Sequence, residues 1–151
     1  MELSSDKNWR TKQAVVEQFP LLAKQLGEAF YIEKINPICI DLIKDPIYTI
    51  RDTALKNFLA LVPIFGANWV VTNILPPLMA CKNEINYLHR LTTLFAVAML
   101  APALPVDVTR QTFLPVLMAL HTDKVANVRM NVAKSIQALL PACKGHGDLI
   151  E

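Results

Sequence analysis

Glycine is scarce in this chain, with four residues among 151, and charged residues make up only 19% of the sequence. Few glycines favour helices, because glycine weakens a helix interior and is needed mainly where the backbone turns sharply. The low charge, together with 53% apolar residues, excludes an intrinsically disordered chain. The sequence therefore predicts a folded protein with a continuous apolar core.

An excess of charge of one sign is also lacking. Fifteen Lys and Arg residues stand against thirteen Asp and Glu residues, and the net charge is +2. Domains that bind nucleic acid concentrate basic residues on one face, whereas the charges here are mixed along the chain. We expect no nucleic-acid partner.

Patterns typical of metal sites and catalytic sites are missing. The three Cys and three His residues show neither a Cys-x-x-Cys nor a His-x-x-x-His spacing. Gly145-His146-Gly147 is too short and too close to the end to cradle a phosphate. No nucleophile, base and orienting group come together. We therefore expect no catalytic residue, no metal, no cofactor and no enzymatic activity.

No secretory signal is expected, because Met1 leads into Glu2, Asp6 and Lys7 instead of a basic start and an apolar run. This predicts a cytoplasmic protein, with a nuclear location left open. An uncharged stretch at residues 58–81 is long enough to span a bilayer. Its prolines and Gly66 predict two helices with a turn at residues 65–67. A membrane-associated helical protein is therefore the least favoured function class.

One short motif recurs at a fixed spacing. It begins with an acid and ends six residues later with a base, and we name its copies turn 1 (6–12), turn 2 (45–51), turn 3 (84–90) and turn 4 (123–129). The acids and bases are Asp6 and Lys12, Asp45 and Arg51, Glu84 and Arg90, and Asp123 and Arg129. Both series step by 39 residues, close to the ~40-residue period of helical repeat arrays.

A helix is expected after each turn, because apolar residues return three, four, seven and ten positions after the base. The predicted ranges of these second helices are 8–26, 47–64, 86–103 and 125–142. First helices are predicted at 30–44, 69–82 and 108–121, and each should bend at a recurrent proline: Pro37, Pro76 and Pro115. Cys39, Cys81 and Cys143 fall in columns that are otherwise apolar, so they should be buried thiols.

These patterns predict an all-α superhelix, a solenoid of antiparallel helix pairs, as a single array over residues 1–151. The predicted repeats are 1–28, 29–66, 67–105 and 106–143, with a frayed tail at 144–151. The first repeat is expected to lack its first helix. Open core faces at the two ends make self-association plausible. Each acid should cap its own helix and reach the base of the neighbouring repeat, so that the eight acids and bases form a structural ladder.

The amino-acid sequence of the repeats resembles that of the carboxyl-terminal HEAT repeats of the scaffold (A) subunit of protein phosphatase 2A. The matching phrases are WR at 9–10, PLLA at 20–23, QLG at 25–27, IYTIRD at 47–52, NYLHRLTTLF at 86–95 and VANVRMNVAKS at 125–135. Turn 1 departs from the family by closing with Thr11-Lys12, and turn 3 departs by opening with Glu84-Ile85. Lysine lacks the planar fork of arginine, so the bonding between repeats should be looser at Lys12.

The resemblance implies a non-enzymatic scaffold whose turns hold the catalytic subunit of a serine/threonine phosphatase 2A-type enzyme. The residues that it implies at the contact are Trp9, Arg10, Ile47, Tyr48, Tyr87 and Leu88. The platform for regulatory subunits would be largely absent. An alternative for the aromatic rings is that each staples its own turn. The alternative function is a generic HEAT-repeat adaptor for another partner, such as a transport or translation-factor-like scaffold, which would bind helical peptides on its concave face.

Overall fold

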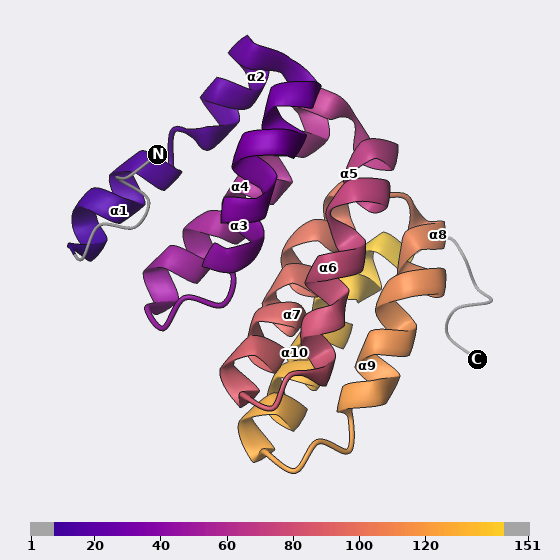
Figure 1. Ribbon diagram of the computed structural model, residues 1–151. Coiled ribbons are helices and arrows are strands. Elements are labelled where there is room, and N and C mark those ends of the chain that lie inside the picture. The colour runs from indigo at the N-terminus through magenta and orange to yellow at the C-terminus, as the bar shows by residue number, and fades with distance from the viewer. Residues whose placement is uncertain (1–7, 144–151) are drawn as a thin grey trace. The chain divides into compact units, whose positions relative to one another are not determined.

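The computed structural model describes residues 8–143, and every regular element within this range is helical (Figure 1). The elements in chain order are α1 (Trp9–Val16), α2 (Phe19–Phe30), η2 (Tyr31–Ile35), α3 (Asn36–Leu42), α4 (Tyr48–Phe65), α5 (Ala67–Asn73), α6 (Leu75–Ala80), η3 (Cys81–Asn83), α7 (Tyr87–Leu100), η4 (Ala101–Ala103), α8 (Val106–Val108), η5 (Thr109–Phe113), α9 (Leu114–Leu120) and α10 (Ala126–Cys143). The predicted all-α class is confirmed.

The helices form two compact units, with unit 1 extending to Ile74 and unit 2 beginning at Leu75. In unit 1, α1 and α2 pack against α4; in unit 2, α7 packs against α10. The arrangement of all four repeats as a single array stays a prediction.

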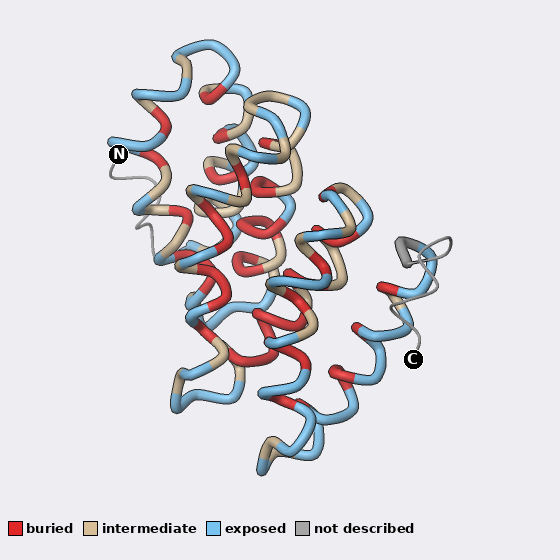
Figure 2. The backbone as a smooth tube through the Cα atoms, turned by 90° about the vertical axis from the view of Figure 1, so that its right-hand side faces the viewer, coloured by how far each residue is buried: buried red, intermediate tan, exposed pale blue. Residues whose placement is uncertain are grey.

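The second helices bury the predicted apolar columns. In α4, Ala54, Phe58 and Leu61 are fully buried, and in α7, Leu94, Val97 and Leu100 are fully buried. Figure 2 shows this alternation of buried and exposed positions along the backbone. The helical spacing of apolar residues therefore does define the core of each unit.

The second helix of the first repeat is broken into α1 and α2, which corrects the prediction of one helix over 8–26. α1 ends at Val16 and α2 begins at Phe19, with Pro20 in its first turn. Proline has no N–H to donate to the carbonyl four residues earlier, which here belongs to Val16. The side-chain amide of Asn57 in α4 donates to that carbonyl instead, at 2.7 Å.

A similar side-chain bond joins α10 to α7 in unit 2. The hydroxyl of Ser135 lies 3.1 Å from the Leu94 carbonyl and 2.9 Å from the Asn131 carbonyl of its own helix, and it shares its one proton between them. Ser135 and Leu94 are separated by 41 residues, the same separation as Asn57 and Val16. Each bond therefore ties a helix to its counterpart in the preceding repeat.

Each first helix changes its backbone bonding just before its proline. π-helical turns at Tyr31–Ile35 and Thr109–Phe113 precede Pro37 and Pro115. The middle copy is instead divided at Ile74 into α5 and α6 before Pro76. The backbone bonding is interrupted before each recurrent proline, but the form of the interruption differs between copies, whereas the sequence predicted the same bend in each.

The predicted turn at residues 65–67 is present. α4 continues through Pro63 to Phe65, Gly66 adopts φ +95°, and α5 begins at Ala67. A positive φ is readily accessible only to glycine, so this residue type terminates the helix cleanly. Among the described residues, no helix is long and apolar enough to cross a membrane.

An aromatic cluster fills the core of unit 1 near this turn. The ring of Tyr31 packs edge-on against Phe65 and Trp69, with centroid distances of 5.8 Å and 5.9 Å. The Tyr31 hydroxyl contacts the Cys39 sulfur at 3.6 Å. These contacts join the first helix of the second repeat to α4 and α5.

Candidate protein-binding turns

The backbone of each turn is held by a side chain that accepts a hydrogen bond from an N–H two residues later. Asp45 accepts from Ile47 and Asp123 accepts from Val125, both at 2.8 Å. In turn 3 this acceptor is Asn86, two residues after the acid, which caps the start of α7. The helix starts are therefore fixed locally, by oxygen acceptors that the sequence places ahead of each helix.

The closing arginine of turns 2 to 4 folds back over its own turn. In turn 2, Arg51 donates to the carbonyls of Asp45 and Pro46 at 2.7 Å and 3.0 Å. In turn 3, Arg90 makes the equivalent pair of bonds at 2.8 Å each, and in turn 4, Arg129 donates to the Asp123 carbonyl at 2.6 Å. A guanidinium can saturate several carbonyls at once because it carries five donors.

Two ion pairs join a turn to the turn that follows it. Lys12 contacts the Asp45 carboxylate at 2.5 Å in unit 1. In unit 2, Arg90 binds Asp123 through two parallel bonds of 2.6 Å and 2.9 Å. The two side chains are only 8% and 7% exposed. The hydrogen bonds from Arg90 hold the pKa of the Asp123 carboxyl below its usual range. Asp6 lies outside the described residues.

The ring side chains of turns 1 and 2 are each paired with an arginine. The guanidinium of Arg10 lies 4.4 Å from the centroid of the Trp9 ring, and that of Arg51 lies 5.8 Å from the Tyr48 ring. Both distances fall within the range of cation–π attraction. Because Arg51 also holds the turn backbone, the position of Tyr48 is coupled to the turn that presents it.

The expected partner-binding residues differ in how far they reach solvent. Tyr48 is 57% exposed, Tyr87 is 41% exposed and Ile47 is 37% exposed. Arg10 is exposed, whereas Trp9 and Leu88 are half-buried. Within unit 1, Trp9 and Arg10 begin α1, and Ile47 directly precedes Tyr48, the first residue of α4; the two helices pack together. Tyr87 and Leu88 begin α7 in unit 2.

One exposed residue of turn 3 was not assigned to the site by sequence reasoning. Ile85 is 91% exposed, more than any other large apolar side chain that the structure describes. It stands where turn 2 has Pro46, and this departure from the repeat was the available signal. His89 points inward, with Nδ1 buried and 3.9 Å from the Glu84 carboxylate. Ile85 therefore adds apolar surface to turn 3, while His89 does not.

The cysteines do not form a reactive or metal-binding site in the part of the chain that is described. Cys39 and Cys81 are buried, and burial raises the pKa of the Cys39 thiol to about 12. The side chain of Cys143 and all of His146 lie outside the description. Within residues 8–143, no three Cys, His, Asp or Glu side chains are grouped as metal ligands.

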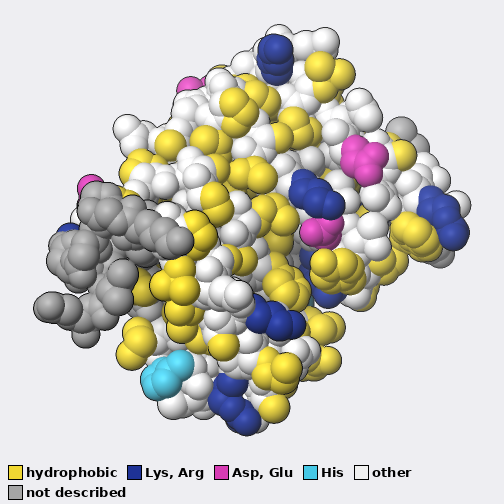
Figure 3. Space-filling model, turned by 180° about the vertical axis from the view of Figure 1, so that it is seen from behind, with side chains coloured by type: hydrophobic (Ala, Val, Ile, Leu, Met, Phe, Trp, Pro, Cys, Tyr) yellow, Lys and Arg dark blue, Asp and Glu magenta, His cyan; other side chains and the backbone are white. Residues whose placement is uncertain are grey.

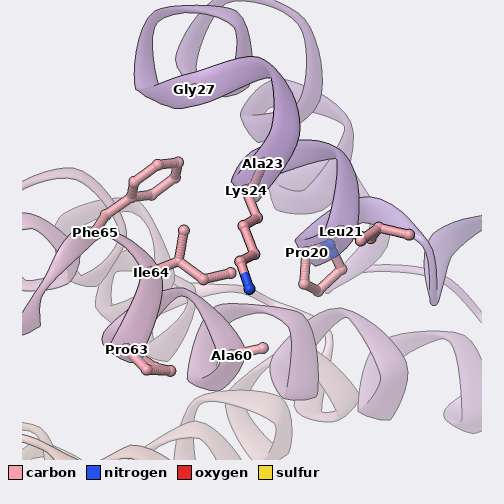
Figure 4. Close-up of a pocket in the computed structure, with 9 residues that line it drawn as sticks. All are labelled: Pro20, Leu21, Ala23, Lys24, Gly27, Ala60, Pro63, Ile64 and Phe65. Atoms are coloured by element: carbon pink, nitrogen blue, oxygen red, sulfur yellow. The ribbon is translucent and has the colours of Figure 1, made fainter.

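An open apolar groove of about 660 Å³ lies between α2 and α4 in unit 1 (Figure 4). Its lining residues are Pro20, Leu21, Ala23, Lys24, Gly27, Ala60, Pro63, Ile64 and Phe65. Lys24 is the one charged residue among them, and its side chain extends between the two helices. On the face seen in Figure 3, other Lys and Arg side chains are scattered among apolar and acidic ones.

Comparison with protein families identifies the repeat. A family model described as HEAT repeat matches residues 113–143, which include α9 and α10. This part of the chain is therefore similar to a HEAT repeat. The 39-residue spacing of the turns and the helix pairs around them agree with that assignment, because HEAT units are helical pairs of about this length.

Two curated relatives of this chain carry the same name. The regulatory A-subunit of protein phosphatase PP2A from Schizosaccharomyces pombe is 41% identical over 75 residues, which is 50% of this chain and 13% of the relative. The protein of that name from Saccharomyces cerevisiae is 36% identical over 82 residues, 53% of this chain and 13% of the relative. The resemblance to the phosphatase 2A scaffold repeats is confirmed, and the matched part covers about an eighth of each relative.

Proposed function

We propose that this chain is a non-catalytic scaffold whose turns bind the catalytic subunit of a protein phosphatase 2A-type enzyme. One structural observation carries the proposal: Tyr48 and Tyr87 are exposed at the starts of α4 and α7, on turns whose backbone is fixed by buried arginines. The similarity to regulatory subunits of this phosphatase supports the choice of partner.

Exposed aromatic rings on a rigid backbone are suited to protein recognition. Tyrosine, tryptophan and arginine dominate binding hot spots, where truncation of one side chain costs about 2 kcal/mol or more. Trp9 with Arg10, Tyr48 and Tyr87 bring these three residue types to the turns. The helices behind them contribute an ordered support and no chemistry of their own, so the proposal assigns the chain a binding role.

The proposal is tested with a purified phosphatase 2A-type catalytic subunit immobilised on a sensor surface. The chain and its Trp9→Ala/Tyr48→Ala/Tyr87→Ala variant are compared over a range of concentrations. We expect the triple substitution to raise the dissociation constant by at least about 100-fold, because several hot-spot contacts are lost together. Circular dichroism should show unchanged helicity, since Tyr48 and Tyr87 are exposed and Trp9 is half-buried.

Leu26→Ala serves as the matched control. Leu26 is 52% exposed and lies near the end of α2 that is remote from turn 1. Its substitution should leave the dissociation constant within about twofold of the original. Equal binding by the triple variant and the unmodified chain would overturn the proposed contact.

The groove between α2 and α4 favours a second candidate function, that of an adaptor for another protein. An amphipathic peptide helix could lay its apolar face on the groove and an acidic residue beside Lys24. Ala60→Trp would fill the groove without touching the turns. Loss of a partner through Ala60→Trp, with binding retained by the triple turn variant, would favour the adaptor over the phosphatase scaffold.

A further inference from the structure

The groove between α2 and α4 is built by two neighbouring helices of unit 1. The residues that form its facing walls are Pro20, Ala23 and Lys24 on α2 and Ala60, Ile64 and Phe65 on α4. The two helices pack against each other, and Figure 4 shows the side chains of both walls around the open space. Both walls are therefore complete within the residues that the structure describes.

Small residues in the two walls leave room for a third helix. Ala23 is fully buried and Ala60 is half-buried. Pro20, Ile64 and Phe65 are half-buried as well, so each presents part of its apolar surface to the groove. Packed helices lie with their axes about 8–10 Å apart, depending on the side chains at the contact, and small residues favour the closer approach. The groove therefore suits a helix as its ligand.

Lys24 gives this apolar groove a single positive charge. In Figure 4 its side chain extends between the two helices, with Ile64 and Phe65 to one side of the ammonium nitrogen and Pro20 to the other. Within residues 8–143, no carboxylate lies within ion-pair distance of this nitrogen. An anionic group of a ligand would therefore meet an ammonium that no acid of unit 1 neutralises.

The charge at this position is a departure from the repeat. Pro63, Pro102 and Pro141 follow one another at steps of 39 residues, and Lys24 occupies the same position in the first repeat. Because the other three repeats have proline here, the packing of the helices does not require a positive charge at this position. The lysine instead gives the groove a charge that the equivalent positions lack.

These features define the chemistry of the ligand. An anionic group belongs beside Lys24, and apolar groups belong on both sides of it. On an α-helix, residues seven positions apart lie on one face about 10.5 Å apart, and a residue three positions after the first lies between them. Pro20 and Gly27, the first and last lining residues of α2, are also seven positions apart. A fatty acid has its carboxylate at one end and would leave one apolar side uncovered.

We propose that the groove binds an amphipathic helix of a partner protein in which an acidic residue lies between two large apolar residues seven positions apart. The acid pairs with Lys24, and the two apolar residues cover Pro20 on one side and Ile64 with Phe65 on the other. Helices commonly bind to grooves through one apolar face, and the charge at Lys24 selects among them. The proposal rests on the adaptor function considered above and names its ligand.

A charge-swap experiment with synthetic peptides tests this ligand. The first probe is a peptide of about 16 residues, rich in alanine and glutamine, with two leucines seven positions apart and a glutamate three positions after the first leucine. In the second probe, lysine replaces the glutamate. Fluorescence anisotropy measures the binding of each labelled peptide to the unmodified chain and to Lys24→Glu.

We expect the preference for the two peptides to reverse with the charge in the groove. The unmodified chain should bind the glutamate peptide with a dissociation constant of about 10–100 μM and the lysine peptide at least about fivefold more weakly. Lys24→Glu should bind the lysine peptide at least about fivefold more tightly than the glutamate peptide. Lys24 is exposed, so this substitution leaves the fold intact.

Lys34→Glu is the matched control. The Lys34 side chain is 52% exposed and lies in η2 of unit 1, outside the groove. Its substitution changes the net charge by the same amount, so the preference for the glutamate peptide should stay within about twofold of the original. Ala60→Trp fills the groove and should abolish the binding of both peptides, with circular dichroism as the check on its fold. The charge swap at Lys24 remains decisive if Ala60→Trp loses helicity.

Four results would overturn the proposal. The first three are a glutamate peptide that does not bind the unmodified chain at about 1 mM, a preference that Lys24→Glu does not reverse, and a reversal that Lys34→Glu also produces. The fourth is displacement of the glutamate peptide by an equal concentration of dodecanoate, which would assign the groove to a fatty acid instead.

The turns are unchanged in all of these variants, so the phosphatase contact can be measured separately. Lys24→Glu should bind the phosphatase catalytic subunit with a dissociation constant within about twofold of that of the unmodified chain. Loss of the peptide preference with retained phosphatase binding would refute the groove ligand alone. Retained peptide preference without phosphatase binding would refute the turn contact alone.

Discussion

The side-chain amide of Asn57 donates to the carbonyl of Val16, the last residue of α1, at 2.7 Å. In a continuous helix that carbonyl would accept from the N–H of residue 20, which is a proline and has none. Val16 is fully buried and Asn57 is 4% exposed, so water is not an alternative partner. The carbonyl that the helix break leaves unpaired therefore forms a hydrogen bond that joins two repeats.

Replacing Asn57 with alanine should lower the free energy of unfolding by about 1–3 kcal/mol, because the buried Val16 carbonyl loses its donor. In a Pro20→Ala background the new N–H can close the helical bond, so the same substitution should cost less by about 1 kcal/mol. Urea unfolding of the four proteins of this double-mutant cycle measures the coupling. Equal losses in the two backgrounds would show that the proline is not the cause.

Arg90→Lys keeps the positive charge of turn 3 but loses the fork that binds Asp123 and two carbonyls together. We expect a loss of about 1–3 kcal/mol in the free energy of unfolding, the range for hydrogen bonds to charged groups. Arg129→Lys makes the same change at an exposed arginine and should cost less than about 1 kcal/mol. Chemical denaturation at pH 7 compares the two, and similar losses would contradict the role assigned to the fork.

Acidification should weaken the contribution of Asp123. Its pKa is lower in the folded protein than the value of about 3.9 for an unperturbed aspartate, chiefly through the bonds from Arg90. The carboxylate therefore stabilises the fold fully above that unfolded value, and the contribution is lost as pH falls through the lower folded value. The stability difference between the unmodified chain and Asp123→Asn should be constant from pH 7 to about pH 5 and shrink below about pH 4. Urea titrations across this range measure it, and a pH-independent difference would argue against the pairing.

Cys39 should resist alkylation in the folded protein. Its thiol is fully buried, so reagents reach it poorly. Its pKa is raised to about 12, so only a small fraction is thiolate at pH 8. We expect iodoacetamide to modify Cys39 at least about 100-fold more slowly in buffer than in urea. Mass spectrometry of the peptide that contains Cys39 reads this site separately from the other cysteines. Protection of less than tenfold would place the thiol near solvent.

The apolar core could be predicted from the sequence because the same helical spacing of apolar residues recurs in each repeat. The apolar spacing of one repeat alone would leave the buried positions ambiguous. Phe58 and Val97 occupy the same position in their repeats as Phe19, and all three are buried. The ends of the helices could also be predicted. Gly66 favours the positive φ that ends a helix, and the side-chain oxygen acceptors of the turns favour helix starts.

Other features depend on partners distant in sequence. Pro20 was a sequence signal for the break between α1 and α2. The hydrogen bond that satisfies the Val16 carbonyl at this break comes from Asn57, and no local sequence pattern connects Asn57 to the break. The π-helical turns before Pro37 and Pro115 contain Tyr31 and Phe113, both fully buried, and no local sequence pattern marked these turns. The exposure of side chains at the turns also required the structure, because Ile85 is 91% exposed while the side chain of His89, four residues later, is only 18% exposed.

The pairing of Arg51 with Tyr48 has a consequence for the entropy of recognition. The guanidinium is held by two carbonyls of its own turn, and the ring lies 5.8 Å from it, within the range of cation–π attraction, so this attraction favours the position of the ring before any other molecule arrives. A side chain that is already restricted loses little rotational freedom when it is covered. A larger share of the free energy from burying Tyr48 is then available to the complex than a freely rotating tyrosine would provide over the same contact area.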